Sequence, residues 1–343
     1  MESKLSVKHC AQCGTQIPPS FLNCPSCQKL VYTEELKKLS EEAVKASGEK
    51  RLSDAMAAWR QALELLPLES RQYQIILEKV AALGKEVDQE SPGKGTGTAP
   101  GVIQEHKSFF GKYGNKAGLV GLAVVLFSKL KFLFLGFTKL HTLLTMLVAL
   151  GAYWALWGWK FALGFVLSIY IHEMGHVEAL GRYGIKASAP MFIPGIGAFV
   201  RLKQNLVNPR EDARVGLAGP LWGLGAAVTS FILFRATELS VFAAIAQTGA
   251  WINLFNLMPV WQLDGGRGFQ SLTSWQRWIA AFVIGVMAYY TREGLLLLLL
   301  ILSLFQALKK DAPKEPDHVG LVQYVFLIMI LSVMTTIPVA KTR

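Results

Sequence analysis

The chain has 343 residues, of which 52% are hydrophobic and only 17% are charged, and its formal net charge is +11. Soluble domains average about 45–50% apolar and about 25% charged residues, so this composition excludes an ordinary soluble globular protein and a disordered chain. The basic surplus does not indicate nucleic-acid binding, because the sequence has no basic patch with interleaved aromatic residues.

The charges are unevenly divided along the chain. Residues 1–116 hold 16 basic and 14 acidic residues, whereas residues 117–343 hold 19 and 10. The first part is therefore polar and nearly neutral, and the second is apolar and basic. This division predicts a soluble head followed by a membrane body whose basic loops lie near anionic lipid. Residues 1–8 lack the apolar core of a secretory signal, so we expect the head to stay in the cytosol.

Two Cys-x2-Cys pairs, ten residues apart, lie near the N-terminus: Cys10, Cys13, Cys24 and Cys27. Each pair can bind one side of a tetrahedral ion, and four thiolates leave no position open, so the pattern predicts a structural zinc site. A redox role is less favoured, because a redox Cys-x-x-Cys normally occurs alone near a βαβ unit. The pattern resembles the zinc ribbons at the front of many prokaryotic proteins, which predicts a ribbon over residues 1–32.

Residues 33–90 are predicted to be helical, beginning with a Thr33 N-cap that is followed by two acidic residues. Residues 55–67 resemble the second helix of a tetratricopeptide repeat, which ends in a proline. Two interpretations remain open: a module that binds a peptide or protein partner, and a plain helical hairpin that packs on the ribbon. Residues 91–101 are rich in Gly, Pro and Thr, so we expect a flexible linker over residues 91–116.

Residues 117–343 are predicted to form an all-α polytopic membrane domain. A spanning helix needs about 20 mostly apolar residues. The stretch 118–136 is apolar, but Lys129 and Lys131 would each cost about 2.5–3.5 kcal/mol at mid-bilayer, so we expect a surface or re-entrant helix there. Other apolar stretches predict about six to seven transmembrane helices. These candidate spans are residues 141–158, 160–180, 213–235, 240–260, 275–291, 294–308 and 319–339.

The basic residues of the connections predict an orientation. The connections that follow the second and the sixth span, and the segment before the first span, carry most of the Lys and Arg residues of the body. By the positive-inside rule these connections face the cytosol, which places the head on the cytoplasmic side of a cell membrane, where thiolates stay reduced. If residues 118–136 crossed the membrane, the parity would reverse and the head would lie outside.

The second candidate span ends in an H-E-x-x-H motif, formed by His172, Glu173 and His176. On a helix, residues i and i+4 lie on one face about 6 Å apart, so the two imidazoles can bind one zinc ion. Glu173 is then close enough to take a proton from an activated water molecule. Ionisable residues within a span are costly and usually functional. A satisfied core histidine is the alternative, but it would not explain Glu173.

The fourth candidate span ends in Asn256-Leu257-Met258-Pro259, and Asp264-Gly265-Gly266 follows. Asp264 lies 88 residues after His176 and returns to the same side of the membrane in the predicted topology. A catalytic zinc site uses three protein ligands, and a carboxylate oxygen can be one of them. Pro259 ends the helix and the two glycines allow a tight backbone, so Asp264 can turn inward. A plain capping turn at the interface is the alternative.

The two motifs, in this order and within apolar spans, resemble the site-2 protease family of intramembrane zinc metalloproteases. Ala218-Gly219-Pro220 also resembles a small-residue segment of that family, and the similarity covers about residues 117–310. The resemblance implies that His172, His176 and Asp264 bind zinc, that Glu173 is the general base and that Asn256 assists the substrate or an intermediate. It also implies transmembrane protein substrates, cleaved near the cytoplasmic side in regulated intramembrane proteolysis. It says nothing firm about the head.

Residues 191–200 are apolar but interrupted by Pro and Gly, so they are a poor helix. We expect a short membrane-associated hairpin whose free edge pairs with an extended substrate, and a simple amphipathic loop is the alternative.

In the third span, small residues favour close helix packing rather than catalysis. These residues are Gly216, Gly219, Gly223 and Gly225.

Two other classes of function remain open at this point. A zinc transporter would need acidic residues along several spans, and the spans away from the two motifs are nearly free of acids. A non-catalytic membrane scaffold would not need Glu173, which is present. The sequence therefore favours a hydrolase.

Overall fold

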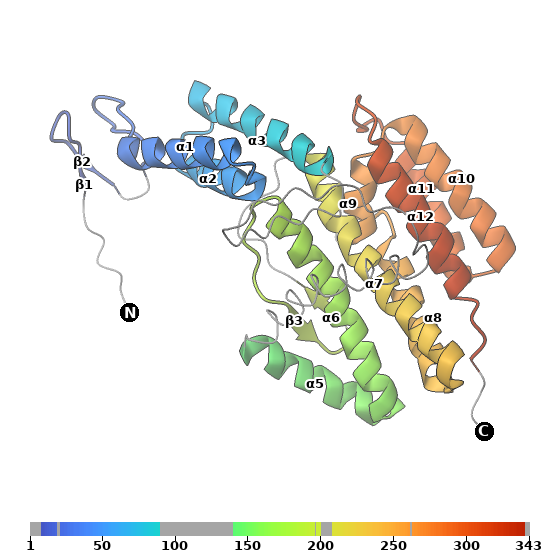
Figure 1. Cartoon of the computed structure of the whole chain (residues 1–343). Coiled ribbons are helices and arrows are strands. Elements are labelled where there is room, and N and C mark those ends of the chain that lie inside the picture. Colours follow the sequence, from blue (N-terminus) through green and yellow to red (C-terminus); the bar gives the residue numbers. More distant parts are fainter. Residues whose placement is uncertain are drawn as a thin grey trace, which may run out of the picture. The chain divides into compact units, whose positions relative to one another are not determined.

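The computed structural model describes residues 8–18, 21–89, 140–195, 197–199, 208–260 and 263–339. Within these ranges it contains 11 α-helices and two small two-stranded sheets (Figure 1). The chain divides into two compact units. Unit 1 comprises residues 1–100 together with Arg182–Ile185, and unit 2 comprises the remainder. The predicted linker and the stretch 118–136 lie outside the described residues.

Unit 1 begins with the cysteine-bearing segment and continues as three helices. Strands β1 (Lys8–His9) and β2 (Gln16–Ile17) pair antiparallel. Three amphipathic helices follow, α1 (Thr33–Gly48), α2 (Leu52–Glu64) and α3 (Arg71–Gln89), and α2 packs between the other two. This region is helical as predicted, but the N-cap of α1 is Tyr32 and not Thr33. Residues 55–67 extend from α2 into the turn that follows it. The likeness to a tetratricopeptide repeat stays a prediction.

Residues 182–185 complete unit 1. Tyr183 is 1% exposed and donates a hydrogen bond to Asp88 of α3, and its backbone carbonyl accepts one from the buried guanidinium of Arg60 in α2 at 3.2 Å. Gly184 has a φ of +67°, and a Cβ atom there would lie 2.3 Å from the carbonyl oxygen of Ser53. Only glycine fits this position, because it needs both the left-handed conformation and the close approach.

Unit 2 consists of eight described helices and one hairpin. The hairpin pairs β3 (Met191–Ile193) antiparallel with β4 (Gly197–Phe199). The helices are α5 (Leu140–Trp157), α6 (Trp159–Arg182), α7 (Pro209–Thr237), α8 (Ser240–Asn256), α9 (Asp264–Gln270), α10 (Ser274–Thr291), α11 (Gly294–Ala307) and α12 (His318–Met334).

Each of the seven candidate spans coincides with one of these helices to within a few residues, and α9 is an additional short helix. Two described helices, α5 and α7, are both long and apolar enough to cross a bilayer, while α11 and α12 are apolar but shorter. Helix α7 begins where the sequence dictates: Asn208 caps it by accepting a hydrogen bond from the Arg210 amide, and Pro209 occupies its first turn.

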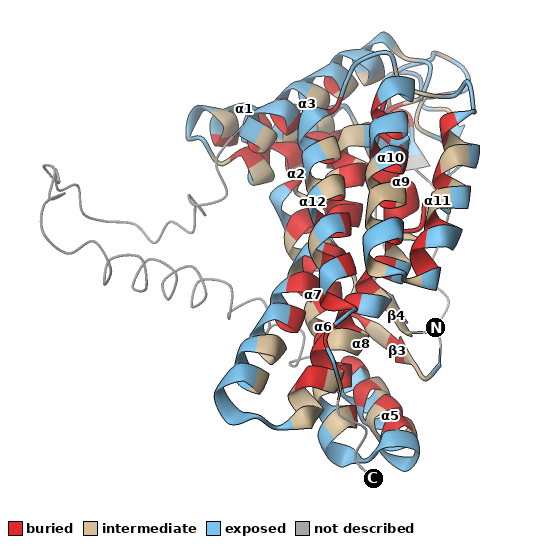
Figure 2. Cartoon of the chain, turned by 90° about the vertical axis from the view of Figure 1, so that its right-hand side faces the viewer, coloured by how far each residue is buried: buried red, intermediate tan, exposed pale blue. Residues whose placement is uncertain are grey.

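Two apolar clusters hold unit 2 together. The larger cluster contains residues from every helix from α7 through α12, among them Leu254, Ile284 and Tyr324. The smaller one joins α5, α6 and β3, and includes Tyr170 and Phe192. Figure 2 shows buried residues along the inward sides of the helices and exposed residues along the outer sides. Many of the exposed residues are large and apolar, as expected for helices that contact lipid.

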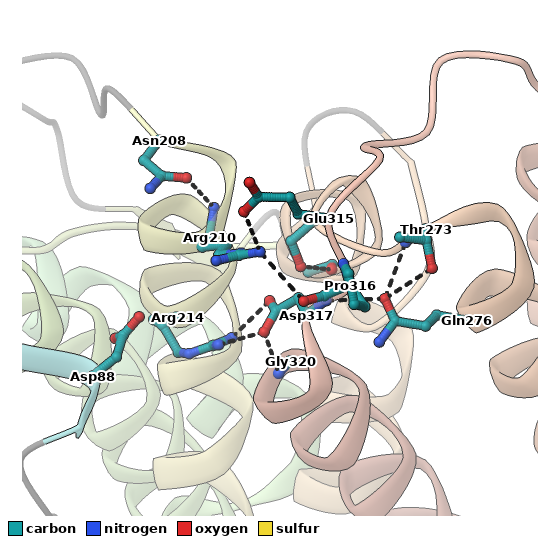
Figure 3. A network of polar contacts seen from close by, with 12 residues as sticks. Asp88, Asn208, Arg210, Arg214, Thr273, Gln276, Glu315, Pro316, Asp317 and Gly320 are labelled. Carbon is teal, nitrogen blue, oxygen red and sulfur yellow. Dashed lines mark hydrogen bonds and ion pairs between the residues drawn. The ribbon is translucent and has the colours of Figure 1, made fainter. Parts of the chain in front are cut away.

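A polar network ties the N-terminal ends of α7, α10 and α12 to one another (Figure 3). Arg214 of α7 donates to Asp317, which in turn caps α12 by accepting from the Gly320 amide. The side-chain oxygen of Gln276 in α10 accepts from the backbone amide of Asp317. Burial alone would raise the pKa of Asp317, but the hydrogen bonds and charge of Arg214 outweigh it and hold this pKa below its ordinary value.

We therefore expect Asp317→Asn to lower the free energy of unfolding by about 2 kcal/mol at pH 7, because it removes a charged hydrogen-bond acceptor from a buried pair. A depressed carboxyl pKa stabilises the folded state above about pH 4, and the benefit is lost as the pH falls through the folded pKa. The difference between wild type and variant should shrink at about pH 3. Denaturant unfolding in detergent micelles at both pH values measures it.

Glu315→Gln is the matched control, since Glu315 pairs with Arg210 in the same network but its side chain is 76% exposed. It should leave stability nearly unchanged. Equal effects of the two substitutions would contradict the importance of the buried pair.

Candidate metal centre

Helix α6 carries both histidines of the H-E-x-x-H motif on one buried face. His172 and His176 are 5% and 7% exposed, and Glu173 between them is 5% exposed. The Nε2 atoms of the two imidazoles lie 3.2 Å apart. The four-residue spacing places both imidazoles on one face of the helix, as predicted, and the Nε2 atom of each ring is directed toward one point.

The outer nitrogen of each ring is held by a hydrogen-bond acceptor. His176 Nδ1 lies 2.8 Å from the carbonyl oxygen of Val215 in α7, and a carbonyl can only accept, so this nitrogen carries the proton. His172 Nδ1 lies 2.8 Å from Asn253 Oδ1 in α8, and the amide of Asn253 donates to the Gly249 carbonyl, which fixes its oxygen toward the ring. Both Nε2 atoms are thus left with free lone pairs, as metal ligation requires.

Asp264 brings the third donor. Its two carboxylate oxygens lie 3.0 Å from His172 Nε2 and 3.3 Å from His176 Nε2. Asp264 is the first residue of α9, so the Asp-Gly-Gly segment opens a short helix. Gly265 allows α9 to approach the end of α8, because a Cβ atom at this position would lie 2.0 Å from the carbonyl oxygen of Leu257.

Three glycines on one face of α7 each make room for one part of the site. A Cβ atom at Gly216 would lie 3.0 Å from the Asp264 carbonyl oxygen, one at Gly219 would lie 2.3 Å from His176 Nε2, and one at Gly223 would lie 2.1 Å from Asn253 Oδ1. Gly225 has open space around it. The predicted packing role holds for Gly216, Gly219 and Gly223, which let α7 approach Asp264, the imidazoles and Asn253, and it does not hold for Gly225.

The donor set fits a zinc ion. With bond lengths of about 2.0–2.1 Å and tetrahedral angles, neighbouring zinc ligands lie about 3.3 Å apart. The two Nε2 atoms lie 3.2 Å apart, one Asp264 oxygen lies 3.0 Å from His172 Nε2 and the other lies 3.3 Å from His176 Nε2. Three protein ligands leave one tetrahedral position for a water molecule or a substrate, as in catalytic zinc sites.

Asn253 and Asn256 lie three residues apart in α8 but differ in burial and contacts. Asn256, which the sequence selected, is the last residue of the helix and is half-buried. The asparagine that contacts a histidine is Asn253, which is 3% exposed and which the sequence reasoning missed. A signal was present, since Asn253 is a strongly polar residue within an apolar span.

The cysteines of unit 1 also converge. Cys10 and Cys27 have their sulfur atoms 3.5 Å apart, as do Cys13 and Cys24, and all four lie within 4.8 Å of one another. A tetrahedral zinc–thiolate site with bonds of about 2.3 Å separates its sulfurs by about 3.8 Å, so the arrangement fits. Gly14 has a φ of +72° in the turn behind Cys13.

The expected hairpin is present and is attached to α5. Thr142 donates to the Pro190 carbonyl at 2.9 Å, Thr145 accepts from the Phe192 amide at 3.3 Å, and Tyr153 accepts from the Gly195 amide at 3.1 Å. The ring of Phe192 stacks on Tyr170, two residues before His172. The hairpin therefore lies beside the part of α6 that begins the motif.

Comparisons with known proteins agree with this geometry. Residues 160–239, which include the H-E-x-x-H helix and α7, match the family model described as Peptidase family M50. The chain is similar to "Zinc metalloprotease MJ0392" of Methanocaldococcus jannaschii, with 30% identity over 124 residues, which are 34% of this chain and 35% of that protein. No solved structure matches the chain.

Plant proteins are also similar. "Probable zinc metalloprotease EGY2, chloroplastic" of Arabidopsis thaliana is 37% identical over 78 residues, which are 21% of this chain and 14% of that protein. The protein of the same name from Oryza sativa subsp. indica is 31% identical over 143 residues, 29% of this chain and 26% of its own length. The chain thus spans about a third or less of these relatives. The family match over residues 160–239 and the names of these relatives support the resemblance to the site-2 protease family.

We expect Gly219→Ala to reduce zinc content at this site by at least about tenfold, because the added methyl group would push both imidazoles away from their common point. Zinc measured by mass spectrometry in the purified protein tests this. Gly225→Ala adds the same methyl group on the same helix in open space and should leave zinc content unchanged. Full zinc occupancy in the Gly219 variant would contradict the geometry.

Proposed function

We propose that this protein is an intramembrane zinc metalloprotease that hydrolyses peptide bonds of transmembrane substrates near the cytoplasmic side of the membrane. One observation carries the proposal: His172, His176 and Asp264, from two helices far apart in the sequence, present their donor atoms to one point, and Glu173 lies next to His172 on the same buried helix. The family match and the relatives' names support the same class of reaction.

The residues divide the work of peptide hydrolysis. A zinc ion held by His172, His176 and Asp264 would supply a Lewis acid for the attacking water and the substrate carbonyl. Glu173 takes the proton of the attacking water and passes it to the departing amine. Asn253 and the Val215 carbonyl hold the imidazoles in the tautomer that leaves Nε2 free. Asn256, at the end of α8, remains our candidate for a polar contact to the substrate.

The membrane setting is part of the proposal. We propose that α5, α6, α7, α8, α10, α11 and α12 make up six to seven spans of a prokaryotic cell membrane, with the head in the cytosol. The apolar outer faces of the helices support this setting, because in water they would be exposed. The basic connections between the spans support the orientation.

The hairpin is our candidate for substrate binding. In an antiparallel pair, alternate residues point their backbone groups away from the partner strand. The Phe192 amide donates to Thr145, so it points away from β4, and α5 occupies the outer edge of β3. Ala198 faces Phe192 in the register, so its amide and carbonyl point to the outer edge of β4. An unwound substrate segment can pair there, which would expose its peptide bonds for hydrolysis.

The head is proposed to hold a second, structural zinc ion through its four cysteines and to bind a protein partner. A four-thiolate site has no open position, so it contributes to folding and not to hydrolysis. The helices α1 to α3 supply the surface on which a partner could bind.

The general-base assignment predicts that Glu173→Gln keeps zinc but cuts about 1000-fold more slowly, because the amide cannot accept the proton. The variant, purified from cells, should retain intact membrane proteins as trapped substrates. Adding wild-type enzyme to the trapped material should release fragments whose new termini are identified by mass spectrometry, and a zinc chelator should prevent their release.

Glu178→Gln is the matched control, since it makes the same change five residues further along α6, about 140° around the helix. It should cleave like wild type. Undiminished cleavage of the trapped substrates by the Glu173 variant would overturn the hydrolase proposal.

The two-zinc proposal predicts two zinc ions per chain in the purified protein. Replacing Cys13 and Cys24 together with Ser should remove one zinc ion and lower the melting temperature of the head, because the thiolates hold it together. Replacing His172 with Ala should remove the other zinc ion and leave the head unaffected. Metal analysis and calorimetry measure both effects, and one zinc ion in the wild type would contradict the count.

A further inference from the structure

The third donor of the proposed zinc site is carried by a small element. The histidines lie on α6, which has 24 residues, whereas Asp264 begins α9, which has seven. The distance from the carboxylate to the imidazoles therefore depends on how α9 is fixed to its neighbours. Its main neighbour is α7, the helix that also holds the outer nitrogen of His176.

Apolar packing fixes the spacing of α9 and α7. A Cβ atom at Gly216 would lie 2.8 Å from Arg267 Cβ, and one at Gly268 would lie 2.8 Å from the side chain of Leu217. These contacts bring the two helices close together. They are non-directional, however, so they leave α9 able to rotate or slide by small amounts.

One directional contact joins the same two helices. Arg267 of α9 donates from Nε to Asp212 Oδ1 of α7 at 2.8 Å, and its Nη2 lies 2.7 Å from the same oxygen. The side chains are only 22% and 28% exposed. A charged hydrogen bond between these groups is stronger and more demanding in geometry than a neutral one.

The two ends of this ion pair lie one helical turn from the site. Arg267 follows Asp264 by three residues in α9, and Asp212 precedes Val215 by three residues in α7. Residues three apart lie on the same side of a helix. The ion pair thus connects the turn that presents the carboxylate of Asp264 to the turn whose carbonyl orients His176.

We propose that Arg267 and Asp212 are positioning residues that fix the rotation of α9 and so set the distance between the Asp264 carboxylate and the two imidazoles. The pair thereby tunes the metal affinity of the site without contacting the metal. This inference rests on the zinc site proposed above. The alternative is an ordinary, partly exposed ion pair, which would contribute a little to stability and nothing specific to metal binding.

Metal affinity separates these two roles. In the purified full-length protein, Arg267→Gln and Asp212→Asn remove the charge of one partner while keeping most of the side-chain volume. Each should weaken zinc binding about tenfold in competition with a chelator of known affinity. Each should also change the visible absorption spectrum of the cobalt(II)-substituted protein, which reports the ligand geometry.

The double variant completes the test. If the residues act through each other, Arg267→Gln combined with Asp212→Asn should weaken zinc binding no more than either change alone. Additive losses, or an affinity and a cobalt spectrum like those of the wild type, would overturn the inference. A melting curve of each variant checks that the fold is intact.

Arg210→Ala is the control. Arg210 lies in the first turn of α7, like Asp212, and pairs with Glu315 instead of α9 (Figure 3). Its loss should leave zinc affinity unchanged, and an equal loss in this control would also overturn the inference. If the wild type binds no zinc through its histidines, the proposed function fails as well. If the wild type binds zinc and the Arg267 and Asp212 variants bind it equally well, only the positioning role fails.

Discussion

The rest of unit 2 is arranged around the convergence of three electron-rich groups in apolar surroundings. Two imidazole nitrogens with free lone pairs and one carboxylate lie within 4.8 Å of one another. Without a cation such groups repel one another, and the surrounding protein offers little solvation for the charge. A bound divalent ion removes both penalties at once. The hydrogen bonds of the two Nδ1 atoms support such an ion, because they leave the lone pairs of both Nε2 atoms directed toward the common point.

Helix α7 contacts each of these groups and holds them in position. Its glycines at 216, 219 and 223 recur every three or four residues, so they form one face, and that face meets α9, the imidazoles and Asn253 in turn. Its backbone also supplies the Val215 carbonyl, and its first turn supplies Asp212. In a bilayer the hydrophobic effect does not drive helices together, so close packing through small residues is the main means of holding such an arrangement. Glycine therefore serves packing and metal geometry in the same positions.

Polar contacts elsewhere in unit 2 occur where they define a connection. Hydroxyl groups of α5 fix the hairpin by its backbone, and the network at Asp317 joins the beginnings of three helices (Figure 3). In both places each contact has a buried or half-buried partner, which is the condition for a polar group near lipid to be stable. The apolar helix faces are left to pack on one another or to meet lipid.

The long helices of unit 2 and the residues His172, Glu173, His176 and Asp264 can be recognised in the sequence alone. Runs of apolar residues mark every long helix of unit 2, because an apolar segment in lipid must satisfy its own backbone hydrogen bonds and a helix does so. The four-residue spacing of His172 and His176 places them on a common helix face. Which asparagine meets His172 depends on how α8 packs against α6, because Asn253 and Asn256 differ by a rotation of about 60° around the helix. The start of a helix at Asp264 and the contact of Arg267 with Asp212 likewise appear only in the folded structure. These contacts join residues tens of positions apart and depend on how the helices pack, and no motif in the sequence marks them.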